Sequence, residues 1–228
     1  MNRLLMVVLA AIIFCSCHTI NGSGNIKSET RDVGTFDKID AIGSINIELV
    51  NDNSPSVRVE ADDNILQYII TDVSSGTLEA RFKSNIMFTN THVKVYVSAT
   101  GIKKLTVTGS GDIVSKDTLK GANEIGLEVT GSGDINAIVD APSVNADITG
   151  SGNITLQGRT KNFDCTISGS GDFKCKNLLS ENTTVTITGS GTAHVFASVG
   201  LKANVSGSGD VYYGGSPAIS GGPVHQEK

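Results

Sequence analysis

An acidic or amide side chain recurs in this sequence at a spacing that could serve ligand binding. Each of six Gly-Ser-Gly triplets is followed by a polar residue, and the six are Asp112, Asp134, Asn153, Asp172, Thr192 and Asp210. Carboxylate and amide oxygens at a regular spacing are ligands that calcium accepts, and they also hydrogen-bond the hydroxyl groups of sugars. Asp112 and Asp134 are neighbouring acidic members of the series, so they are its weak ligand candidates.

The charge pattern of this series favours a structural role over a calcium site. Neighbouring copies would lie about 5 Å apart if the repeats stack as strands, and bare carboxylates at that distance repel by roughly 1 kcal/mol in water. Calcium sites cluster acids, whereas Asn153 and Thr192 separate the acids here. Asp and Asn also hydrogen-bond the amides of turns. We therefore expect turn residues and no metal.

Two cysteines flank one of the corners and leave two interpretations open. Cys165 and Cys175 are centred on Ser170, at positions that other repeats fill mainly with aliphatic residues. They are either small apolar core residues or a disulfide, which would close a short loop and contribute about 2–3 kcal/mol. A bond requires Cα atoms within about 7 Å of each other, and hence a narrow repeat unit.

Signs of catalysis are weak in this sequence. The four histidines are scattered, at His18, His92, His194 and His225. No HExxH, GxSxG or phosphate-binding loop occurs, and the repeated GSGD lacks the strand-to-helix context of a nucleotide site. We predict no catalytic residues and no cofactor. An enzyme of the β-helical polysaccharide-lyase type remains an alternative, although such enzymes need Asp, Lys and Arg together in one cleft.

The amino-acid composition limits the classes of partner that this protein could bind. Acidic residues exceed basic ones by 23 to 18 without a basic stripe, which argues against nucleic acid. Aromatic residues make up 5% and Trp is absent, so flat ring surfaces for sugars are scarce. Tyr212 and Tyr213 lie near the C-terminal end, where they either cap the core or take part in binding.

The elements that would position these residues follow from the repeat. The first glycines of the triplets are separated by 22, 19, 19, 20 and 18 residues, and no helical pattern lies between them. Around each triplet, apolar and polar residues alternate, as in Leu127, Val129, Ile135 and Ala137. Each unit is thus predicted to be a strand, a corner and a second strand, closed on the far side by looser turns such as 139–142 and 157–160. A period near 20 residues indicates the rungs of a β-solenoid.

Glycine explains why the corners recur. A sharp reversal uses backbone angles open mainly to Gly, and stacked corners leave no room for a Cβ. The structural corner glycines are Gly109, Gly111, Gly131, Gly133, Gly150, Gly152, Gly169, Gly171, Gly189, Gly191, Gly207 and Gly209. The half before residue 105 also alternates but is less regular, and we expect leading rungs or a capping sheet. There, 43–45 and 74–76 resemble eroded corners, and residues near 61–69 predict one short helical turn.

The N-terminus predicts export and lipidation. Arg3, an apolar run and then Ser16–Cys17 resemble a bacterial lipoprotein signal over residues 1–17, with Cys17 as the lipidated residue. Cys15 is the poorer candidate because Phe14 precedes it. Residues 18–33 are rich in Gly, Ser and Asn and are predicted to be a flexible tether. Residues 214–228 are predicted to be a disordered tail.

The order FDKIDAIGSINIEL, SVRVEADDNILQYIITDVSSGTLEARF and VKVYVSATGIKKLTVTGSGDI resembles the GIN-domain family of putative auto-transporter adhesins. The resemblance covers residues 34–213, with the regular array at 105–213. It implies a right-handed parallel β-helix, typical of proteins exported by Bacteroidetes-type bacteria, and it brings no catalytic residues. We therefore expect an all-β, non-enzymatic lipoprotein of the outer membrane, facing the periplasm or the cell surface. Its predicted partners are the membrane, through the lipid, and an envelope protein or glycan; the alternative is a carbohydrate-active or carbohydrate-binding β-helix.

Overall fold

Alternating apolar residues place nearly the whole chain in β-strands. The computed structural model describes residues 18–227, so the predicted signal and Cys17 lie outside the described part. The strands are β1 (His18–Asn21), β2 (Ile26–Arg31), β3 (Lys38–Gly43), β4 (Asn46–Val50), β5 (Ser56–Asp62), β6 (Ile69–Ser74), β7 (Thr77–Phe82), β8 (Ile86–Thr89), β9 (Val93–Ser98), β10 (Lys104–Gly109), β11 (Ile113–Lys120), β12 (Glu124–Gly131), β13 (Asp134–Gly150), β14 (Asn153–Gly169), β15 (Asp172–Gly189), β16 (Thr192–Ala197), β17 (Gly200–Gly207), β18 (Asp210–Gly215), β19 (Ala218–Gly221) and β20 (His225–Gln226). No helix of the described residues is long and apolar enough to cross a membrane.

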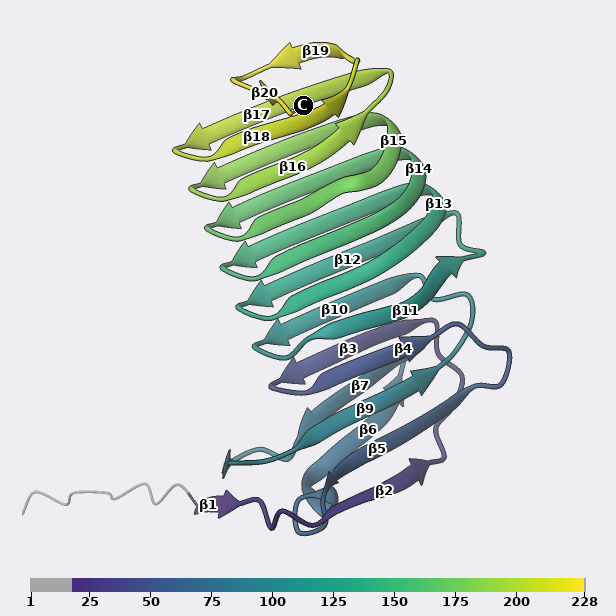
Figure 1. The fold of residues 1–228 in the computed structure, drawn as a ribbon. Helices are drawn as coiled ribbons and strands as arrows, with labels where there is room; N and C mark the ends of the chain where they lie inside the picture. The colour runs from purple at the N-terminus through teal and green to yellow at the C-terminus, as the bar shows by residue number, and fades with distance from the viewer. Residues whose placement is uncertain (1–17, 228) are drawn as a thin grey trace, which may run out of the picture.

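The repeats stack as parallel rungs, which confirms the predicted β-solenoid. The first glycine of each corner pairs with the first glycine of the next, from Gly109 through Gly131 and Gly150 to Gly207. Figure 1 shows the result, a ladder of paired legs in which all the corners lie along one edge. Because the register repeats, every residue type in the triplet forms a straight column along the molecule.

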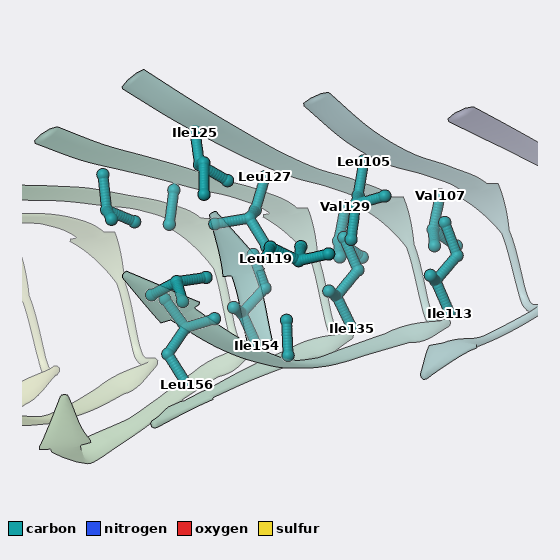
Figure 2. Close-up of a cluster of buried hydrophobic side chains, with 14 of the residues drawn as sticks. Leu105, Val107, Ile113, Leu119, Ile125, Leu127, Val129, Ile135, Ile154 and Leu156 are labelled. Atoms are coloured by element: carbon teal, nitrogen blue, oxygen red, sulfur yellow. The ribbon is translucent and has the colours of Figure 1, made fainter. Parts of the chain in front are cut away.

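The core fills the space between the two legs of each rung. Leu127 and Val129 come from the leg before the corner, and Ile135 comes from the leg after it; all are buried. Figure 2 shows these side chains meeting between the two layers of strands, with Leu105, Val107 and Ile113 from the neighbouring rung beside them. Burial of each such side chain contributes roughly 1.5–3 kcal/mol to the free energy of folding. Stacking adds apolar neighbours from the rung above and the rung below.

The far side of the rungs is more regular than predicted. Instead of breaking at loose turns, β13 and β14 run without interruption through residues 139–142 and 157–160. Asp140 pairs with Arg159 in the strand register, and the Arg159 guanidinium lies 2.7 Å from the Asp140 carboxylate. The strands stay continuous here because the backbone at these bends pairs with the equivalent residues of the next rung.

The N-terminal half is one leading rung and a capping sheet. The corner predicted at 43–45 is confirmed, since Gly43 has φ 84° and pairs with Gly109. The corner predicted at 74–76 is wrong: Ser75 and Gly76, both with positive φ, turn the antiparallel hairpin of β6 and β7. The predicted helical turn is a short 3-10 helix, η1 (Leu66–Tyr68).

The flexible tether predicted at 18–33 is not what the structure shows. Strand β1 pairs with β8, and β2 pairs antiparallel with β5. Between them, the Asp62 carboxylate accepts a hydrogen bond from Gly24 N–H at 2.7 Å, and the Asp63 carboxylate accepts from Ser23 Oγ and Asn25 Nδ2, each at 2.7 Å. The bonds from Ser23 and Asn25 lower the pKa of Asp63 to about 2. The segment at 22–25 has the composition of a linker, but side chains about forty residues away in the chain hold it in place.

The tail at 214–228 is predicted to be disordered, but its described residues, 214–227, also carry strands. Strand β19 pairs with β17, and β20 pairs with β18, so the tail covers the last rung. His194 and Glu227 lie 2.6 Å apart and connect the end of the tail to the rung below. The unpaired edge of the last rung supplies backbone partners that the local sequence does not reveal.

Candidate functional site

The corner backbone explains the repeated glycines. At each first glycine φ lies near +130°, from 123° at Gly207 to 135° at Gly169, a conformation that other residues rarely adopt. At each second glycine, such as Gly152, an added Cβ would overlap the carbonyl oxygen of the rung below. The N–H groups of Ser132 and Gly133 both donate to Gly109 O, at 2.8 and 3.1 Å, and the neighbouring corners repeat this arrangement. The glycines thus set the spacing of the rungs.

At three of the corners, the acidic residue that follows joins one rung to the next. Asp112 Oδ1 accepts a hydrogen bond from Asp134 N–H at 3.0 Å, and Asp134 Oδ1 accepts from Asn153 N–H at 2.8 Å. Asp172 does the same for Thr192 N–H at 2.9 Å. The expected bond to a turn amide exists, but its donor belongs to the following rung. The two ligand candidates, Asp112 and Asp134, each devote one oxygen to this ladder.

Replacing Asp172 distinguishes the ladder from a functional carboxylate. Asp172→Asn keeps an Oδ1 acceptor for Thr192 N–H, so we expect a change of less than about 0.5 kcal/mol in the free energy of unfolding. Asp172→Ala removes the acceptor and should cost about 1 kcal/mol. Guanidinium unfolding measures both variants. A large loss of stability or of partner binding in Asp172→Asn alone would instead indicate a functional charge.

A repeated polar surface lies beside these corners, and we call it the hydroxyl edge. It consists of two exposed columns, one before and one within the corners: Thr108, Thr130, Thr149, Ser168, Thr188 and Ser206, and Ser110, Ser132, Ser151, Ser170, Ser190 and Ser208. The first column is in register from rung to rung, at about 4.8 Å per step. Each hydroxyl can donate and accept. The search of the sequence for acids and histidines missed this surface, although a Thr or Ser precedes every corner glycine in the sequence.

The cysteines form part of the core. Cys165 pairs in register with Ala146 and Val185, and both Cys165 and Cys175 are free, buried thiols. Burial raises the pKa of both thiols, which makes them poor nucleophiles. The structure thus holds them as small apolar residues, without the alternative disulfide.

The two tyrosines near the C-terminal end have different roles. Tyr213 points inward and is buried, so it caps the core. Tyr212 lies on the outside between His194 and His225, with ring centroids 4.9 and 5.2 Å away. Because the rings stack on one another, the Tyr212 faces are covered and do not offer a platform for a sugar.

Concave sites in the described part of the chain are either small or shallow. No group of three or more His, Cys, Asp or Glu side chains within residues 18–227 is placed to hold a metal ion. A cavity of about 200 Å³ lies under the first rung and is lined by residues including Arg31, Phe36 and Ala99. Ligand pockets usually enclose about 300–1,000 Å³, and the larger hollows of the described residues, of about 310–590 Å³, are shallow and open to solvent. The hydroxyl edge is therefore the most extensive candidate for binding.

Comparisons with known proteins agree with this architecture. The family described as "Putative auto-transporter adhesin, head GIN domain" matches residues 35–217. A structure described as a putative lipid binding protein from Parabacteroides distasonis is 25% identical, with a TM-score of 0.77 over 92% of this chain and 100% of that chain. Putative adhesins from Bacteroides fragilis (22% identity, TM-score 0.83, 91% and 99% covered) and Parabacteroides merdae (20%, 0.73, 92% and 100%) share the fold. No curated protein matches the chain.

Proposed function

This chain belongs to the head GIN domain family of putative auto-transporter adhesins, and from this premise we propose that it is an exported, non-enzymatic lipoprotein of the cell envelope. Cys17 would carry the lipid that anchors it to the outer membrane. The solenoid would act as a binding scaffold that presents the hydroxyl edge to an envelope partner. The family description supports an adhesin, and the relatives named above are described as adhesins or as a lipid binding protein.

The observation that carries this proposal is the hydroxyl edge. The inward residues fill the core, the glycines allow close stacking, and the Asp and Asn side chains join the rungs. The exposed Thr and Ser side chains of the two columns have none of these three structural roles. Straight columns of small donors and acceptors suit a partner that is itself repetitive, since many weak contacts then act together. An extended envelope glycan meets this description best, held by hydrogen bonds and not by aromatic stacking.

A charge placed on the hydroxyl edge tests this function. Thr130→Lys with Thr149→Lys should reduce recovery of the partner in a pull-down from native envelopes, because the lysines would displace the repeated hydroxyl contacts. Gln157→Lys with Asn177→Lys adds the same two charges on adjacent rungs of the exposed far side, and this matched control should bind normally. Treating the extract with glycosidases or with protease before the pull-down identifies the partner class. Equal recovery by the edge and control variants would contradict the proposal.

Cys17→Ala tests the lipid anchor. We expect this variant to move from the membrane fraction to the soluble fraction, because the remaining thiol of the signal, Cys15, follows Phe14 and is a poor acylation site. Cys15→Ala is the matched control, and it should remain in the membrane fraction with an intact lipid. Fractionation with mass spectrometry of the N-terminus measures both. A membrane-bound Cys17→Ala protein would show that the anchor has another origin.

A further inference from the structure

The lipid of the proposed lipoprotein would be attached almost directly to the folded cap. Thr19 of β1 pairs with Met87 of β8. Two residues of chain span at most about 7 Å, and paired strands lie about 5 Å apart. Cys17 can thus be no farther than about 12 Å from the Met87 backbone. A free 16-residue tether would instead allow the domain to range over roughly 20 Å or more.

The segment after Cys17 is fixed to the cap by several independent hydrogen bonds. Asn64 Nδ2 donates to Asn21 O at 2.8 Å, and Asn64 Oδ1 accepts from Ser23 N–H at 3.1 Å. Gly22 N–H donates to Thr89 O at 3.1 Å. Asp62, only 1% exposed, binds Gly24 N–H and, through its other oxygen, His92 N–H at 2.7 Å. These contacts oppose peeling of β1 away from the domain.

Two exposed apolar side chains belong to the strands near this attachment point. Met87 of β8 is 53% exposed and Ile26 of β2 is 43% exposed. Strand β1, which pairs with β8, and strand β2 lie at the N-terminal end of the stack (Figure 1). Beneath β8, half-buried Phe82 and Phe88 pack against the core and stack at 4.6 Å between ring centroids, and Tyr68 joins Phe88 at 5.6 Å. Exposed apolar side chains such as Met87 and Ile26 favour the headgroup boundary of a bilayer.

Charge at this end is compatible with a lipid surface. Lys83 is exposed, and its Nζ lies 5.7 Å from the centre of the Tyr68 ring. Lys27 is neutralised by Asp63, whose carboxylate is 3.3 Å away. Contact with the bilayer would therefore depend on the acyl chains and the apolar side chains more than on lipid charge.

We infer that the cap surface formed by β1, β8 and Ile26 lies against the outer-membrane bilayer, with the C-terminal rung held away from it. The occupant is a phospholipid surface, and the inference rests on the proposed acylation of Cys17. Strand β1, which pairs with β8, and the β17–β18 rung lie at opposite ends of the stack (Figure 1). Successive rungs rise by about 4.8 Å each, so the upper part of the hydroxyl edge would stand clear of the headgroups.

Site-specific labelling of the lipidated protein tests this orientation. Met87→Cys and, as a matched control, Leu179→Cys in the upper half of the solenoid are each labelled with an environment-sensitive fluorophore; both native side chains are more than half exposed. Cys165 and Cys175 are buried and should not react. The proteins are reconstituted into phosphatidylethanolamine–phosphatidylglycerol vesicles that contain a nitroxide-headgroup lipid. We expect about a twofold loss of fluorescence at residue 87, as for a group in the headgroup region, and no loss at residue 179.

The possible results separate this inference from the proposed function. If mass spectrometry shows the lipid and the protein floats with the vesicles, but residue 87 is no more quenched than residue 179, the docking surface is wrong and the lipoprotein stands. Strong quenching at residue 179 would likewise overturn the orientation. If the purified envelope protein carries no lipid on Cys17, both proposals fail.

Discussion

Gly152→Ala is expected to destabilise the solenoid by at least about 3 kcal/mol, at the upper end of the range for overpacking. Gly152 does not need a positive φ; its constraint is the rung below. An added Cβ would overlap Gly133 O and come within 2.7 Å of Val129 Cγ1. Backbone in a stacked sheet cannot give way without breaking its own hydrogen bonds. Gly150→Val should cost still more, because Gly150 also has φ 125°.

Two other glycines act as controls that separate backbone strain from the clash of an added Cβ with the rung below. Gly121 has φ 90° but open space around it, so Gly121→Ala should cost only the backbone strain of roughly 1–2 kcal/mol. Gly126 lies in β12 with ordinary room, 3.5 Å to Lys104 Cγ, and Gly126→Ala should be within about 0.5 kcal/mol of the native protein. Guanidinium unfolding midpoints at constant slope measure all four variants. If Gly152→Ala is as mild as Gly126→Ala, the rungs are not stacked as closely as described.

Phe173→Ala should be the most damaging truncation in the core, with a cost of about 3–5 kcal/mol. Phe173 is fully buried and meets Phe163 edge-to-face, with ring centroids 6.3 Å apart. Its neighbours in the adjoining rungs are Ile154 and Ala193. Ala193 is too small to fill the space that the ring would leave, so a cavity should persist.

The matched variants for this core site lie at the same corner. Phe173→Leu retains most of the apolar volume and should cost less than half as much as Phe173→Ala. Lys174→Ala changes the exposed neighbour and should be nearly neutral. Chemical denaturation again provides the measurement. Equal stability of Phe173→Ala and Lys174→Ala would mean that neighbouring rungs collapse into the space, which the repeated ladder of hydrogen bonds should prevent.

The regular half of the fold was predictable because its determinants are local. Leu127, Val129 and Ile135 alternate with polar residues around one triplet, and a single unit of about 20 residues contains the whole pattern. Repetition of that unit then requires stacking, since one rung alone cannot bury its apolar face. The corner at 43–45 was predictable for the same reason, because the residues after it continue the alternation.

The candidate site was predictable only in part. The acids after the corners were visible, but the donor that each one binds comes from the next rung, 19 to 22 residues later. The exposed hydroxyl columns follow from the same register. Each Thr or Ser is unremarkable alone, and it becomes part of a surface only when the rungs align.

By itself, the sequence determined the rung: its two alternating strands, its glycine corner and the apolar residues between the legs. The roles of the irregular segments depend on contacts with residues far away in the chain. Residues 74–76 turn a hairpin because β7 pairs with both β6 and β3, and the Gly-rich segment at 22–25 is ordered because Asp62, Asp63 and Asn64 bind it. The physical reason is that backbone and carboxylate groups bind any suitable donor or acceptor that the fold brings near. Hydrogen-bonding residues about forty positions apart produce no repeating pattern in the sequence from which their contact could be predicted.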